Sequence, residues 1–175
     1  INVHAARGAV VVAIDLSGDS LHRRGYRGGQ GAAPLKENLA AAILLRAGWP
    51  AIAATGGAFV DPMCGSGTFA IEAAQIAANI APGLSRKGFG FERWKQHDAG
   101  SWQAIRTEAQ SQSAPELLTR GRIRGFDRDP VVLRDAALNA ERAGLADRIL
   151  FQRSELANLP AAPAPRGLIA VNPPY

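Results

Sequence analysis

The sequence predicts an α/β protein with a mainly parallel sheet, truncated after its fourth parallel strand and preceded by a short β-hairpin. Three observations support this fold class. From residue 58 onward, short apolar runs alternate with segments of helical pattern, an order typical of parallel strands joined by crossover helices. Glycine or proline stands at most of the expected boundaries. Hydrophobic residues make up 47% of the 175 residues, which is enough to bury one core.

A hairpin and one helix are expected before the first parallel strand. Strands are predicted over 1–4 and 10–16, because the second run is apolar and β-branched and residues 7–8 can form the turn between them. A helix is predicted over 34–47, because proline favours the first turn and apolar residues follow at helical spacing. Gly48 is the expected stop of this helix.

Strands and helices alternate in the rest of the chain. Asp129 as N-cap and Pro130 at the first helical position form a favoured helix start, and Gly144 forms a favoured stop. Residues 84–119, with two tryptophans and mixed charges, are interpreted as an insertion with one helix. Strands are predicted over 58–61, 122–126, 149–152 and 168–171, and helices over 68–80, 101–111 and 130–143.

Charge and cysteine content limit the partners of the chain. With 20 Lys and Arg against 15 Asp and Glu, the formal net charge is +5, which favours a polyanionic partner such as a nucleic acid. The single cysteine, Cys64, allows no disulfide within the chain and no cysteine-based zinc site, and it suits a reducing cytoplasm. No apolar run approaches the ~20 residues of a membrane span. Neither a metal nor a membrane partner is expected.

A glycine-containing turn after the first parallel strand has the composition of a ligand-binding loop. It reads Asp61-Pro62-Met63-Cys64-Gly65-Ser66-Gly67-Thr68. Gly65 and Gly67 let the backbone approach a ligand, and the helix that follows presents free N–H groups. A plain strand-to-helix turn is the alternative. The run Gly65–Ala70 also fits a dinucleotide pattern. However, the acidic residue expected about 20 residues on stands only at Asp127, and Asp61 suits a cationic amino group and would repel a pyrophosphate.

Charged residues also follow the next two parallel strands. Asp127 can accept both hydroxyls of a ribose, Arg128 can lay its stem along an adenine face, and Glu155 can accept from the adenine amino group. Each of them alone is equally well explained as a helix cap or a solvated loop charge. Because the carboxyl ends of parallel strands meet at one edge of the sheet, the three together predict a nucleoside-binding pocket.

The tetrapeptide Asn172-Pro173-Pro174-Tyr175 indicates the chemistry. Two prolines fix the backbone and remove two donors, so nearby carbonyls stay free as acceptors. An exocyclic amine on a conjugated ring is a poor nucleophile, but the Asn172 side chain and the Pro173 carbonyl can hold its two hydrogens and orient its lone pair toward a sulfonium methyl group. Tyr175 can stack on the target base. A proline turn after a strand is the alternative interpretation.

These residues resemble a known family. Asp61–Thr68, Asp127, Glu155 and Asn172–Tyr175 resemble motifs I, II, III and IV of the Rossmann-like, class I S-adenosylmethionine-dependent amino-methyltransferases. Glu155 departs from the aspartate that is usual in the third motif. More narrowly, three segments resemble the bacterial 23S ribosomal RNA guanine-N2 methyltransferase L family, whose relatives share a THUMP RNA-binding domain. These segments are residues 15–27, 33–43 and 61–68.

The resemblance implies a Rossmann-like methyltransferase that uses S-adenosyl-L-methionine and modifies the N2 of a guanine in 23S ribosomal RNA or its precursor. It also implies that the helix after Pro34 covers one side of the cofactor. The implied cofactor-binding residues are Asp61, Pro62, Cys64, Gly65, Ser66, Gly67, Thr68, Asp127, Arg128 and Glu155. The implied catalytic residues are Asn172, Pro173, Pro174 and Tyr175. The basic loop expected to face RNA contains His22, Arg23, Arg24, Tyr26 and Arg27.

Two regions follow from the resemblance. Residues 1–32 are expected to hold the N-terminal strands and the basic loop, at the end of a THUMP-linking, RNA-binding region. Residues 33–175 are expected to form the N-terminal part of the catalytic domain. Both ends are expected to continue in a longer protein, and the 175-residue chain alone to be weakly active or inactive.

Three alternatives stay open. The Asn-Pro-Pro-Tyr motif also serves methylation of adenine N6 in DNA or RNA and of glutamine side chains in proteins. The run Gly65–Ala70 leaves a nicotinamide dehydrogenase as a second alternative. The third is a fragment that binds RNA or cofactor without catalysis.

Overall fold

A four-stranded parallel sheet forms the centre of the protein. The computed structural model describes residues 1–28 and 35–173. The strands stand in the order β5-β4-β3-β6, with bounds Ala58–Asp61 for β3, Ile123–Asp127 for β4, Ile149–Arg153 for β5 and Gly167–Ile169 for β6. From β3 the chain moves outward through β4 to β5, and β6 then returns to the other side of β3. The loops after β3 and β6 therefore meet at the point where the strand order reverses, which is the favoured ligand site of such sheets.

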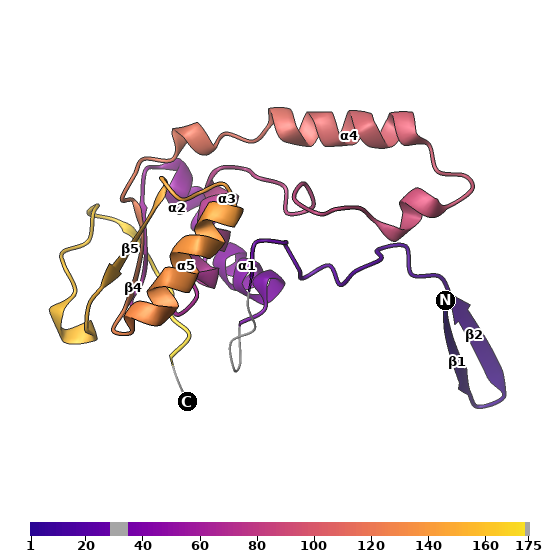
Figure 1. Ribbon diagram of the computed structural model, residues 1–175, viewed down its shortest axis with the longest axis horizontal. Helices are drawn as coiled ribbons and strands as arrows, with labels where there is room; N and C mark the ends of the chain where they lie inside the picture. The colour runs from indigo at the N-terminus through magenta and orange to yellow at the C-terminus, as the bar shows by residue number, and fades with distance from the viewer. Residues whose placement is uncertain (29–34, 174–175) are drawn as a thin grey trace.

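Two crossover helices cover one face of this sheet. Helix α3 (Thr68–Ala77) joins β3 to β4, and α5 (Pro130–Arg142) joins β4 to β5. Both crossovers advance in the same direction across the sheet, so they lie on the same face, and the two helices contact each other. Helix α1 (Glu37–Arg46) packs on α3, and the short helix α2 (Trp49–Ala54) contacts both α3 and β6 (Figure 1).

The core lies between α3, α1 and the sheet. Helix α3 is lined with small residues, among them Ala70, Ala73 and Ala74, all fully buried, which let α1 approach closely. Trp49 packs edge-on against Phe59, with ring centroids 5.5 Å apart. The Trp49 indole N–H donates to the Ala73 carbonyl over 2.8 Å, so this large side chain is buried with its polar atom satisfied.

The N-terminal hairpin and α4 lie away from the sheet. Strands β1 (Asn2–Ala6) and β2 (Ala9–Ala13) are antiparallel, and every residue of both is exposed. Figure 1 shows the hairpin at the opposite end of the molecule from β4 and β5, with α4 (Ala99–Ser111) running between the two ends along one side. An aromatic cluster of Phe89, Phe91 and Trp102 packs α4 onto the chain before it.

The expected elements are present with shifted ends. The strand expected over 10–16 is β2, which ends at Ala13 because its partner β1 has only five residues to pair with it. The helix expected over 68–80 ends at Ala77, because Asn79 takes a left-handed φ of 53°. The first helix begins at Glu37, and the predicted start at Pro34 lies outside the described residues.

Some secondary structure was not expected from the sequence. Helix α2 has only six residues, with a proline at its second position, which is too short for a periodic pattern. Three 3₁₀ turns cover Gly90–Arg93, Pro115–Leu117 and Leu156–Asn158. Among residues 1–28 and 35–173, no helix has the length and apolar character needed to cross a membrane.

Candidate active site

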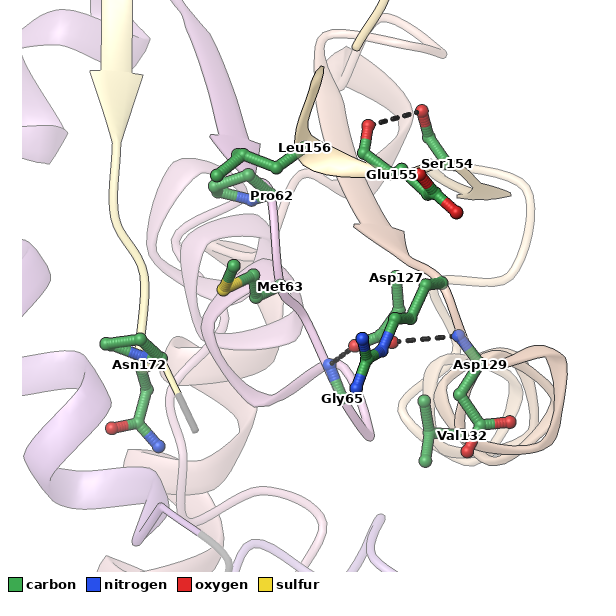
Figure 2. A pocket seen from close by; sticks show the side chains of 12 residues that line it. Pro62, Met63, Gly65, Asp127, Asp129, Val132, Ser154, Glu155, Leu156 and Asn172 are labelled. Atoms are coloured by element: carbon green, nitrogen blue, oxygen red, sulfur yellow. Dashed lines mark hydrogen bonds between the residues drawn. The ribbon is translucent and has the colours of Figure 1, made fainter. Parts of the chain in front are cut away.

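A cavity of about 740 Å³ opens at the carboxyl ends of the parallel strands. It joins the loop after β3 and the segment after β6, as the position of the two strands side by side requires. Figure 2 shows Asn172 and Asp127 on opposite sides of Met63. The cavity is lined by Pro62, Met63, Gly65, Asp127, Arg128, Asp129, Val132, Ser154, Glu155, Leu156, Asn172 and Pro173.

The loop between β3 and α3 is shaped by two glycines. Gly65 and Gly67 have φ values of 49° and 84°, in the left-handed region that favours glycine. A Cβ at Gly67 would lie 2.9 Å from the Phe151 ring and 3.0 Å from the Ala136 methyl group, whereas a Cβ at Gly65 would meet nothing within 4 Å. The first glycine therefore leaves the cavity open, and the second lets the loop pack on α5 and β5.

Asp127 fixes this loop from the neighbouring strand. Its Oδ2 accepts a hydrogen bond of 2.9 Å from the Gly65 N–H, and its Oδ1 accepts one of 3.0 Å from the Asp129 N–H (Figure 2). The Asp127 carbonyl accepts from the Ser154 N–H after β5. One residue thus connects the three loops that follow β3, β4 and β5. Because a carboxylate has about four lone-pair sites, Asp127 can still accept from a ligand.

Asp61, at the end of β3, is 2% exposed and does not line the cavity. Burial raises the pKa of its carboxyl group from the ordinary 3.8 to about 7. The Met63 N–H, which donates to Oδ1 over 3.1 Å, opposes this rise, and the negative charge of Asp127 adds to it. The carboxyl group expected to meet a cationic ligand group therefore lies beneath the start of the loop.

Three further residues of the loop that were expected to bind cofactor do not line the cavity. Cys64 is buried, and burial is also the main cause that raises the pKa of its thiol. The Ser66 carbonyl accepts a hydrogen bond from the Asn139 side-chain amide. Thr68 is buried at the first turn of α3, where its hydroxyl accepts from Arg27. The predicted loop therefore has a front that lines the cavity, with Pro62 and Gly65, and a back that faces the rest of the protein, with Cys64, Ser66 and Thr68.

At the rim, Arg128 and Glu155 are exposed and line the cavity together with Asn172 and Pro173. Pro174 and Tyr175, expected to complete the catalytic segment, lie outside the described residues. Met63, which also lines the cavity, belongs to the predicted loop, whereas sequence reasoning missed Asp129, Val132, Ser154 and Leu156. Each of these stands within five residues of a predicted site residue. They could have been predicted by including every residue that closely follows the end of a parallel strand.

The loop expected to face RNA points largely inward. Tyr26 is 2% exposed, and its hydroxyl donates to Glu72 of α3 over 3.0 Å. Arg24 and Arg27 form ion pairs of 3.5 Å and 3.7 Å with the buried Glu72 and Glu37. Tyr26 is therefore a core residue, and the expectation that its ring faces RNA does not hold.

Two members of the same loop remain accessible. His22 is half-buried and Arg23 is exposed. The basic loop therefore presents only part of its positive charge to solvent, and the rest neutralises buried glutamates.

Comparison with known proteins gives a consistent result. The model of the RMKL-like methyltransferase domain family matches residues 24–175. A ribosomal RNA large subunit methyltransferase K/L from Allochromatium vinosum is 53% identical over 176 residues, which cover 100% of this chain and 24% of the relative. The chain thus spans about a quarter of the length of this curated relative.

Two solved structures have the same fold. SMU.472, a putative methyltransferase complexed with SAH, is 41% identical with a TM-score of 0.82, covering 92% of this chain and 40% of that one. A predicted N6-adenine-specific DNA methylase from Listeria monocytogenes gives the same identity, TM-score and coverage. The Rossmann-like methyltransferase fold expected from the sequence is thereby confirmed. On the match of the family model and the identity to the curated relative, the chain belongs to the RMKL-like methyltransferase domain family.

Proposed function

We propose that this chain is the cofactor-binding part of an S-adenosyl-L-methionine-dependent methyltransferase that modifies the N2 of a guanine in 23S ribosomal RNA. The observation that supports this proposal most strongly is the shared cavity, in which the Gly65 loop and Asn172 lie on the same open space. A group held by the loop can therefore meet a base held at Asn172.

The charges around the cavity fit this cofactor. Among the residues that the structure describes, three carboxylates line it, Asp127, Asp129 and Glu155, against one cation, Arg128. An acidic rim attracts a ligand with sulfonium and ammonium groups and repels a pyrophosphate. The lining thus argues against the nicotinamide dehydrogenase alternative, as does the family.

Each part of the cofactor has a candidate partner in the chain. Asp127 would accept from ribose hydroxyls, Glu155 from the adenine amino group, and the Gly65 loop would lie along the ligand. Bound there, S-adenosyl-L-methionine supplies an electrophilic methyl group. Asp61 would act from beneath the loop, through the hydrogen bond that its carboxylate accepts from the Met63 N–H.

The target amine would be held by Asn172 and the residues after it. The Asn172 side chain is exposed and lines the cavity, so its amide oxygen is available to an N–H of the base. The Pro173 carbonyl would accept a hydrogen bond from the second N–H of the amine, and Tyr175 would stack on the ring of the base. These two hydrogen bonds would orient the amine lone pair and stabilise the positive charge that develops on nitrogen. After methyl transfer the cationic nitrogen would release a proton to water, so no strong base is required.

The substrate class is proposed from the relatives and the charge. The curated relative is named for the large ribosomal RNA, and the net charge of +5 favours a polyanion. His22 and Arg23 are the members of the basic loop placed to contact RNA. Residues 1–32 would then link an RNA-binding THUMP region to a catalytic domain at 33–175.

Two measurements test the proposal. Calorimetry with S-adenosylhomocysteine and with NADH tests the cofactor, and binding of NADH alone would overturn it. Methyl transfer from labelled cofactor to 23S rRNA, tRNA, DNA and release-factor protein tests the substrate, with product nucleosides identified by mass spectrometry. We expect N2-methylguanosine in 23S rRNA. Labelled N6-methyladenine or methylglutamine as the only product would instead favour the alternative substrates.

A further inference from the structure

The segment from Arg24 to Gly28 crosses behind the Gly65 loop and is bonded to three helices. Arg24 and Tyr26 both reach Glu72 of α3, at 3.5 Å and 3.0 Å. Because Glu72 is 2% exposed and its pKa is raised mainly by burial, these two partners satisfy a carboxyl group that has little contact with water. The segment is thus held in place before it reaches the loop.

Arg27 connects this segment to the beginning of α3. Its Nη2 donates to the Leu35 carbonyl over 2.8 Å and to the Thr68 hydroxyl over 2.7 Å, and its Nε lies 3.7 Å from a carboxylate oxygen of Glu37. Thr68 directly follows Gly67, the residue at which the loop enters the helix. The forked guanidinium therefore fixes the exit of the loop against α1.

Asn139 of α5 holds the loop at Ser66, two residues before Thr68. Its side chain is 3% exposed, and its amide N–H donates to the Ser66 carbonyl over 3.1 Å. Its amide oxygen accepts from the Gly28 N–H and from Arg142 Nη1, each over 3.3 Å. A single buried amide thus joins the loop, the basic segment and α5. The Arg142 guanidinium lies directly against Gly28, in the space that a Cβ at this position would occupy.

These contacts hold the back of a loop whose front lines the cavity. Gly65 faces the cavity, while Ser66 and Thr68 are held by Asn139 and Arg27. We propose that Asn139 and Arg27 are positioning residues, which set the affinity for the cofactor without touching it. This inference rests on the proposed function, because it takes the Gly65 loop as the cofactor site.

Asn139→Asp tests the proposal. The carboxylate keeps the acceptor for Gly28 and Arg142 but loses the donor to the Ser66 carbonyl. We expect the Kd for S-adenosylhomocysteine, measured by calorimetry well below the melting temperature, to rise about fivefold, as expected for the loss of one buried hydrogen bond. The number of binding sites per chain should stay at the wild-type value. If the variant were instead partly unfolded, the number of sites would fall while the Kd of the folded molecules stayed the same.

Two further variants complete the test. Arg27→Lys keeps the charge beside Glu37 but lacks the planar, fixed guanidinium that bonds Leu35 and Thr68, and it should raise the Kd about threefold. It remains informative if Asn139→Asp does not fold. Asp135→Ala, exposed and one turn earlier on α5, is the matched control and should leave the Kd unchanged.

The outcomes separate the two proposals. Wild-type Kd values in both variants, with normal binding by the wild-type chain, would overturn the positioning role alone. No binding of S-adenosylhomocysteine by the wild-type chain would overturn the proposed function, and this inference with it.

Discussion

The carboxylate of Asp127, at the end of β4, accepts a 2.9 Å hydrogen bond from the Gly65 N–H in the loop after β3. The acid expected to recognise a ribose therefore also orders the neighbouring loop of the same cavity. Ligand contact and loop order depend on one side chain, so a change there is expected to affect both.

Asp127→Ala should lower both stability and affinity. The variant leaves the N–H groups of Gly65 and Asp129 without their acceptor, which costs about 1–3 kcal/mol in the free energy of unfolding. It should weaken binding of S-adenosylhomocysteine at least about tenfold, by loss of a charge-assisted contact. Urea unfolding and calorimetry measure the two effects. Asp147→Ala, an exposed aspartate in the turn before β5, is the control and should change neither quantity.

The raised pKa of Asp61 predicts a specific pH dependence. Between about pH 4 and pH 7 the folded state holds a proton on Asp61 that the unfolded state has released, so this group makes stability fall as pH rises. The loss amounts to at most about 4 kcal/mol across the full interval. In Asp61→Asn, which keeps the acceptor for the Met63 N–H, this contribution is absent.

Urea unfolding of the wild type and of Asp61→Asn from pH 4 to pH 8 measures the difference. We expect the variant to gain stability relative to the wild type as pH increases. Parallel curves for the two proteins would show that the Asp61 carboxyl group titrates in its ordinary range.

Gly67→Ala separates strain from collision. Alanine at this φ of 84° would place its methyl group 2.9 Å from the Phe151 ring, and we expect a loss of about 3 kcal/mol in unfolding free energy. Gly144→Ala has a similar φ of 71° but no atom within 4 Å of the new Cβ, so only about 1 kcal/mol should be lost. Thermal unfolding compares them. Equal losses would mean that β5 yields to the added methyl group.

Asn172→Ala should separate binding from catalysis. We expect kcat for methyl transfer to fall about 100-fold, because the amide oxygen that holds the target amine is lost. The Kd for S-adenosylhomocysteine should change less than about threefold, since Asn172 lies across the cavity from Asp127 (Figure 2). Steady-state kinetics and calorimetry are the measurements. A large rise in the Kd with unchanged kcat would place Asn172 in the cofactor site instead.

Tyr26→Phe should affect the stability of the fold, and Arg23→Ala should affect RNA binding. Removing the buried Tyr26 hydroxyl deprives Glu72 of a donor and should cost about 1–2 kcal/mol of stability, with RNA affinity unchanged. Arg23 is exposed, so its loss should weaken RNA binding and its salt dependence, with stability within about 0.5 kcal/mol of the wild type. Filter binding at several salt concentrations and thermal unfolding distinguish the two roles.

The parts of the fold that depend on local signals were predictable. The parallel strands are short apolar runs with glycine or proline nearby, and the Asp129–Pro130 start of α5 is present as expected, with the Asp129 side chain accepting from the Val131 N–H. The rule that the ends of parallel strands converge predicted that Gly65, Asp127 and Asn172 lie close together, and all three line one cavity in the structure.

The unexpected features depend on contacts between distant residues. Tyr26 stands in a basic stretch typical of an RNA-facing loop, and its true partner, Glu72, lies 46 residues away. Glu72 has the sequence pattern of an ordinary helix residue, yet it is 2% exposed and is bonded to Arg24 and Tyr26, which lie more than 40 residues earlier in the chain. Asn139 likewise has no sufficient local signal, because two of its three partners, Gly28 and Ser66, come from distant parts of the chain.

The β1–β2 hairpin has a consequence for how the molecule opens. Its backbone hydrogen bonds are covered by no buried side chain, whereas β3 and β4 lie within the core. Amide protons of Asn2–Ala13 should therefore exchange with deuterium within seconds, while those of Phe59 and Phe126 should be protected for far longer. We therefore expect the β1–β2 hairpin to unfold locally far more often than the parallel sheet that shapes the cavity.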